Sequence, residues 1–177
     1  MSDRLERARE ALGRVEQILA GLPGIREYKD KEIRREVDRR VREELMAALE
    51  AVRSSLTDLQ NEVLSAGGIR WMNDLERIHS RLTLLHDKVR SAAYGYRPLF
   101  DLERVREAEL ERLLAFDRDI LARIPELEER LAAARAAATQ SAEAFGTALQ
   151  ELYATLTDLL ETYSRRERFA HGEDQTE

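Results

Sequence analysis

Apolar residues recur along this chain at alternating spacings of three and four, the period that places them on one face of an α-helix. Sustained over several heptads, this spacing is typical of the seam of a coiled coil or a bundle of long helices. Five stretches carry the pattern, at Leu5, Ala8, Leu12, Val15, Leu19 and Leu22; Leu49, Val52, Leu56, Leu59 and Val63; Leu75, Ile78, Leu82, Leu85, Val89 and Ala92; Ile120, Ile124, Leu127, Leu131 and Ala134; and Phe145, Leu149, Leu152, Leu156, Leu159 and Tyr163. No strand pattern appears. We therefore expect an all-α protein, an elongated antiparallel helical bundle or coiled coil of about five helices.

Helix breakers between these stretches set the expected boundaries. Gly21-Leu22-Pro23-Gly24 ends the first helix, Gly67-Gly68 predicts a hairpin, and Thr139-Gln140-Ser141 marks the last break. Pro125 lies inside the fourth stretch, and because the apolar stripe keeps its phase across it, we expect one kinked helix. The five expected helices span about residues 2–20, 28–66, 70–93, 102–138 and 142–169.

Short connections between long helices predict antiparallel neighbours. We expect residues 25–170 to form the long-helix bundle, residues 1–24 to be an accessory N-terminal helix with its Gly/Pro break, and residues 171–177 to be a disordered tail. A thin bundle has apolar stripes on more than one side, and the first helix has little core of its own to join. This predicts a homo-oligomer, with a dimer favoured.

Composition narrows the function classes. The net charge of −6, from 35 acidic and 29 basic residues, argues against nucleic acid as the main partner. The absence of cysteine excludes disulfides, thiolate catalysis and cysteine-based metal sites. No apolar run approaches the 18 residues of a membrane span, and the charged N-terminus does not resemble a signal peptide. A cytoplasmic location is the expectation.

Motifs for chemistry are sparse. Glu76 and His79 form an E-x-x-H pair, whereas a di-iron carboxylate bundle needs two such pairs and two further glutamates. With Thr83, His86 and Arg90, they are better interpreted as a polar ridge facing solvent or a partner. Phosphate-binding loops and nucleophile elbows are absent from the sequence. We expect no enzyme activity, no cofactor and no metal; a helical di-iron-like enzyme is a second alternative.

Two surfaces are candidates for interaction. Lys31, Arg35, Arg39 and Arg42 form a basic stripe that either meets phosphates, anionic lipid or an acidic partner, or pairs with glutamates at helical spacing. Arg165, Arg166 and Arg168 are a smaller cluster with the same two interpretations. Tyr94, Tyr96 and Phe100 surround Gly95 and Pro98, where they either cap the core or dock a partner. Trp71, beside the Gly67-Gly68 turn, is a candidate cap for the other end.

Asp117 conflicts with the seam. Heptad spacing back from Ile120 gives positions 117, 113 and 110, of which only 117 is a carboxylate. Either Phe116 turns inward and Asp117 stays in water, or Asp117 faces the seam and needs a partner such as arginine. We favour the solvated alternative, because Leu114, Phe116 and Leu121 offer another apolar face.

Two segments carry a family resemblance, residues 28–39 (YKDKEIRREVDR) and residues 91–101 (SAAYGYRPLFD). Together they resemble a family of bacterial helical proteins in which a charged helix start precedes a Gly-Gly hairpin and a Y-G-Y loop. The resemblance covers roughly residues 26–120, with Glu27 where the pattern has glycine. Members of that family are encoded near genes for membrane-scaffolding SPFH (flotillin-like) proteins, so the resemblance implies a scaffold or a membrane partner.

The expected function is therefore a non-catalytic coiled-coil scaffold or adaptor that mediates protein–protein interaction, either with itself or with another helical partner. The alternative is a peripheral membrane-associated factor that binds anionic lipid or an SPFH-type partner. The sequence contains no feature that identifies the partner.

Overall fold

The computed structural model describes residues 2–20, 31–95 and 107–171, with only the backbone described at some helix ends. The elements are α1 (Ser2–Ala20), α2 (Lys31–Ser65), the 3₁₀ turn η2 (Ile69–Trp71), α3 (Met72–Gly95), α5 (Glu107–Ala138) and α6 (Ala142–His171). Five long helices and no strand occupy these ranges, so the predicted all-α bundle is confirmed. His171 still belongs to α6, and the rest of the expected tail lies outside the described residues. No helix in the described ranges is both long and apolar enough to cross a bilayer.

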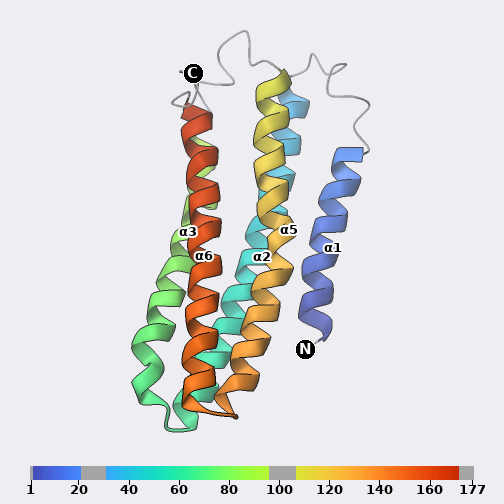
Figure 1. Cartoon of the computed structure of the whole chain (residues 1–177). Coiled ribbons are helices and arrows are strands. Elements are labelled where there is room, and N and C mark those ends of the chain that lie inside the picture. The colour runs from blue at the N-terminus through green and yellow to red at the C-terminus, as the bar shows by residue number, and fades with distance from the viewer. Residues whose placement is uncertain (1, 21–30, 96–106, 172–177) are drawn as a thin grey trace.

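Two antiparallel hairpins, α2–α3 and α5–α6, pack side by side (Figure 1). Helix α2 contacts α3 and α5, while α6 contacts α3 and α5, so α2 and α6 occupy diagonal corners of a four-helix bundle. Helix α1 packs against α2 and α5 on the outside of this square and runs antiparallel to both (Figure 1). Both interhelix turns therefore lie at one end of the bundle, which we call the hairpin end.

The Gly67-Gly68 turn shows why the first hairpin needs glycine. Gly67 adopts φ 78°, the left-handed conformation that commonly ends helices. The Gly68 amide donates to the Val63 carbonyl at 2.8 Å. A Cβ on Gly68 would lie 2.6 Å from Val63 Cγ1 and 2.9 Å from the Val63 carbonyl oxygen. The turn that the dipeptide predicted is thus confirmed, and both glycines are required for its geometry.

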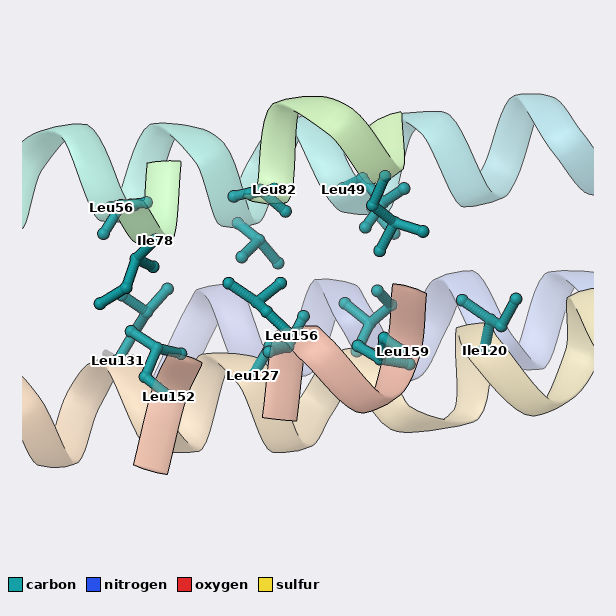
Figure 2. Packing of buried hydrophobic residues seen from close by; sticks show 14 of the residues in the cluster. Leu49, Leu56, Ile78, Leu82, Ile120, Leu127, Leu131, Leu152, Leu156 and Leu159 are labelled. Carbon is teal, nitrogen blue, oxygen red and sulfur yellow. The ribbon is translucent and has the colours of Figure 1, made fainter. Parts of the chain in front are cut away.

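The core is the predicted seam. Leu49 and Leu56 from α2, Ile78 and Leu82 from α3, Ile120, Leu127 and Leu131 from α5, and Leu152, Leu156 and Leu159 from α6 converge on the bundle axis (Figure 2). All ten are buried, and each buried aliphatic side chain of this size contributes about 1.5–3 kcal/mol.

Helix α1 joins the same core rather than forming one of its own. Its Ala11 and Val15 are buried in the cluster that the other four helices share. Exposed ion pairs flank this contact, with Arg14 Nη2 2.9 Å from Glu44 of α2 and Arg118 of α5 3.3 Å from Glu16. The apolar side of α1 therefore finds partners within the chain, and it gives no separate reason to expect self-association.

Helix α5 continues through Pro125 as one helix, as the phase of its stripe predicted. Ile124 and Leu127 on either side of the proline are fully buried. Proline removes one backbone hydrogen bond inside a helix, and the packing of these neighbours offsets that loss.

The glycines provide a stability test. Gly13 lies inside α1 with no atom near the position of a Cβ, so Gly13→Ala should stabilise the fold by about 0.5–1 kcal/mol. Gly68→Ala should instead destabilise it by about 1–3 kcal/mol, because Val63 must move. Urea unfolding followed by circular dichroism measures both changes. Equal effects of the two variants would contradict the described turn.

Candidate functional site

A cluster of charged side chains lies inside the bundle, away from the hairpin end. Arg166 of α6 donates from Nε and Nη2 to both carboxylate oxygens of Asp117 on α5. Its Nη2 also lies 3.8 Å from Oδ1 of Asp38, which comes from α2 at the diagonal corner. Arg42, one turn further along α2, lies 2.7 Å from Asp38 Oδ2. Two arginines thus balance two aspartates, and all but Arg42 are almost completely buried.

The burial of these charges is costly, and their mutual pairing opposes the cost. Burial raises the pKa of the Asp117 carboxyl well above its ordinary value, and the negative charge of Asp38 raises it further. Burial likewise lowers the pKa of the Arg166 guanidinium to about 10, so this side chain stays charged at neutral pH. The bidentate contact favours the charged forms of both partners.

Tyr163 completes this polar layer. Its hydroxyl donates to the backbone carbonyl of Lys88 on α3 at 3.2 Å, and its ring lies 5.4 Å from the Arg166 guanidinium carbon. Burial, followed by the charge of Asp117, raises the pKa of the Tyr163 phenol far above its ordinary value. With Tyr163, every helix of the four-helix square contributes to one polar layer.

The expectation that Asp117 stays in water was wrong. Its side chain is fully buried, whereas Phe116, the alternative inward residue, is only partly buried. The physical reason is Arg166, which meets the carboxylate across the α5–α6 interface and removes the need for solvent. Arg166 is therefore not part of an exposed basic cluster.

The structure describes the side chains of only two of the four residues in the predicted basic stripe, Arg39 and Arg42. Arg42 is mostly buried and paired with Asp38, and Arg39 contacts Glu36 at 2.8 Å and Glu43 at 3.6 Å. For these two arginines the alternative of pairing at helical spacing is the one observed. Lys31 and Arg35 lie in α2, but their side chains are outside the described residues.

The other candidates from the sequence are placed as follows. Tyr94 lies in the last turn of α3, but its side chain is outside the described part of the chain. Tyr96 and Phe100 lie wholly outside the described residues. In the E-x-x-H ridge, Glu76 and Arg90 are exposed while His79, Thr83 and His86 are partly buried. No group of three or more potential metal ligands occurs among the described residues.

The hairpin end contains a hollow of about 490 Å³ between the two interhelix turns. Trp71 forms one wall and packs edge-on against Phe145, with ring centroids 5.2 Å apart and an interplanar angle of 82°. Trp71 is thus the bundle-end cap that the sequence suggested. Arg70 and Arg135 line the same hollow, the first with its guanidinium carbon 4.8 Å from the Trp71 ring centroid and the second 2.7 Å from Glu62.

A second group, which sequence reasoning missed, lies between α3 and α6. Two arginines of α3 flank the Tyr153 ring of α6, with the guanidinium carbons of Arg77 and Arg81 4.9 and 4.7 Å from its centroid. Hydrogen bonding to the arginines, Arg81 first, lowers the pKa of the Tyr153 phenol. The spacing of 77 and 81 by one helical turn was a signal for a shared face, but their partner lies on another helix.

Comparisons with protein-family models, with curated proteins and with solved structures found no match. The resemblance to SPFH-associated helical proteins therefore stays a prediction.

The buried ion pair can be tested by substitution. Asp117→Leu leaves Arg166 buried without its bidentate partner and should destabilise the fold by about 3–5 kcal/mol. The double variant Asp117→Leu/Arg166→Met replaces both charges by apolar groups and should recover most of that loss. Glu151→Leu, which removes an exposed pair with Arg130 across the same helix interface, should cost less than about 1 kcal/mol. A double variant as unstable as Asp117→Leu would contradict the pairing.

Tyr153 and Tyr163 should ionise at different pH values, one below and the other above the ordinary pKa of a tyrosine. Because the pKa of Tyr153 is lowered and that of Tyr163 is raised, Tyr153 should become anionic below its ordinary midpoint near pH 10, while Tyr163 stays protonated as long as the fold persists. NMR of ¹³Cζ-labelled tyrosine during an alkaline titration follows each ring, with assignment from Tyr→Phe variants. Coincident titration of the two rings would refute the described environments.

Proposed function

We propose that this chain is a non-catalytic interaction protein, a scaffold or adaptor, that binds a second copy of itself through the hairpin end. One observation carries the proposal. Three large apolar side chains are strongly exposed in the described ranges, and two of them, Leu64 and Ile69, come from the hairpin end, where their chain neighbours Val63 and Arg70 line the hollow. Ile69 is 75% exposed. Exposed apolar side chains at one end of a bundle, next to a hollow, mark an interaction surface.

The long faces of the bundle are less suited to this role. Their arginines bind acidic residues of neighbouring helices, as Arg123 does with Asp158 and Arg14 with Glu44. At the hairpin end, by contrast, the partly buried Trp71 lies over the buried Phe145 and offers aromatic surface, and aromatic residues are enriched at the centres of protein interfaces. A two-fold contact between identical hairpin ends would bring both copies of this surface together.

Anionic-lipid binding is the less supported alternative. It depends on the basic stripe of α2, where Arg39 and Arg42 already meet carboxylates of the same helix. A lipid headgroup would have to compete with these pairs.

Self-association is tested by sedimentation velocity at tens of micromolar protein. The wild-type chain should sediment as a dimer of 20.4 kDa protomers, and Ile69→Glu and Leu64→Glu should shift it toward monomer, because a charge must then enter an apolar contact. Leu84→Glu is the matched control, since Leu84 is 50% exposed against 52% for Leu64 but lies mid-way along α3.

A wild-type monomer at that concentration would refute the proposal. So would a dimer that Leu84→Glu dissociates as readily as Ile69→Glu does. Unchanged circular dichroism spectra of the three variants would show that the comparison is between folded proteins.

A further inference from the structure

A small groove runs along the α3–α6 interface beside Trp71. Its volume is about 190 Å³, which is below the usual range for drug-sized ligands and suits a compact group. Trp71, Ile78 and Leu149 supply its apolar lining. Gly146 faces Trp71, where a Cβ would lie only 3.2 Å from the indole Cη2, so the absence of a side chain lets the ring lie close to α6.

The phenol at the other side of the groove is prepared to donate a hydrogen bond. Arg81 donates from Nε and Nη2 to the Tyr153 hydroxyl oxygen, at 3.0 and 2.7 Å. A phenol oxygen that accepts two hydrogen bonds keeps its own proton for a further acceptor. No described residue accepts that proton, and the neighbouring positive charges strengthen the O–H group as a donor.

The charges around the groove leave a surplus of one positive charge. Arg77 lines the groove with Asp74, and their closest approach is 3.9 Å, longer than a hydrogen bond. Arg81 adds its charge behind the phenol, and in the described ranges it contacts no carboxylate. Two arginines against one aspartate suit a singly charged anion better than a dianion.

We propose that this groove binds a small organic monocarboxylate with an apolar body. One carboxylate oxygen accepts the Tyr153 proton and the other accepts from the guanidinium of Arg77, whose side chain is 65% exposed. The apolar body lies against Trp71, Ile78 and Leu149. This site shares Trp71 with the hairpin-end hollow, but its hydrogen-bonding groups, Tyr153 and Arg77, do not line that hollow, so loss of binding and loss of self-association can be told apart.

The chain contains its own reporter for the experiment. Trp71 is the only tryptophan in the sequence, so the intrinsic indole fluorescence follows this one ring, which borders both the groove and the hairpin-end hollow. Variants of Arg77 and Tyr153 assign a signal to the groove, because neither residue lines the hollow. We would titrate the full chain with 3-phenylpropionate, with the neutral analogue 3-phenylpropan-1-ol, and with inorganic phosphate at constant ionic strength. 3-Phenylpropionate should change the fluorescence saturably. The alcohol and phosphate should bind at least about tenfold more weakly, because the alcohol lacks the charged hydrogen-bonding group and phosphate does not match the groove.

Variants identify the groups responsible. Tyr153→Phe removes the hydrogen-bond donor and Arg77→Gln removes the cation. Each substitution should weaken the binding of 3-phenylpropionate by about tenfold. Arg90→Gln is the matched control, because Arg90 lies on the same helix with 67% exposure and contacts Asp87 three residues earlier, as Arg77 contacts Asp74. Arg90→Gln should bind like the wild type. Arg77→Gln alters an exposed side chain, so it keeps the test valid even if Tyr153→Phe unfolds.

Four results would overturn the proposal. These are the absence of saturable binding at millimolar acid, equal binding of acid and alcohol, tighter binding of phosphate than of acid, and equal losses in Arg77→Gln and Arg90→Gln. A peptide that carries an acidic side chain and binds where the free acid does not would assign the groove to a protein partner instead.

Discussion

A buried guanidinium inside an apolar seam constrains how these helices align. Arg166 of α6 must meet Asp117 of α5 and also approach Asp38 of α2 at the diagonal corner. Sliding one helix by a heptad, about 10 Å, would again place apolar residues against apolar residues. It would also leave charges buried without partners, which is far more costly than an imperfect apolar contact. The polar layer therefore selects one register among several that the seam alone permits.

The constraint also gives the bundle two chemically different ends. The charge cluster lies toward the starts of α2 and α5, where Asp38 and Asp117 are found, whereas both turns close the opposite end. Because the cluster is neutral and internally paired, it has little to offer a partner. The hairpin end instead places Trp71 and Phe145 around a hollow, and no described helix covers its exposed apolar residues. The surface proposed for interaction and the layer that fixes the register thus lie at different ends of one seam.

The periodicity made the fold predictable. The spacing of leucine and valine predicted the five helices, and Gly67-Gly68 predicted the first turn. The polar layer was harder. Arg166 continues the seam of α6 three residues after Tyr163, and Asp117 continues that of α5 three residues before Ile120. Opposite charges on two seams were the available signal, but Phe116 offered a competing rotation of α5. The Tyr153 group was beyond sequence reasoning, because it depends on the stagger of α3 against α6.

Charge pairing explains why the surface composition is a poor guide to partners. Exposed interhelix pairs such as Arg130–Glu151 each contribute about 0–1 kcal/mol, less than one buried leucine. Their effect is to specify which helices are neighbours. Together with the pairs inside single helices, such contacts with carboxylates occupy most of the described arginines. Arg70 and Arg81 differ, because among the described residues they meet Trp71 and Tyr153 rather than carboxylates. Cations held against aromatic rings keep their charge available. Arg70 lies against Trp71, and Arg81 holds the phenol of the groove that Trp71 lines, so this part of the bundle combines apolar surface with positive charge and best matches an acidic, apolar ligand or partner.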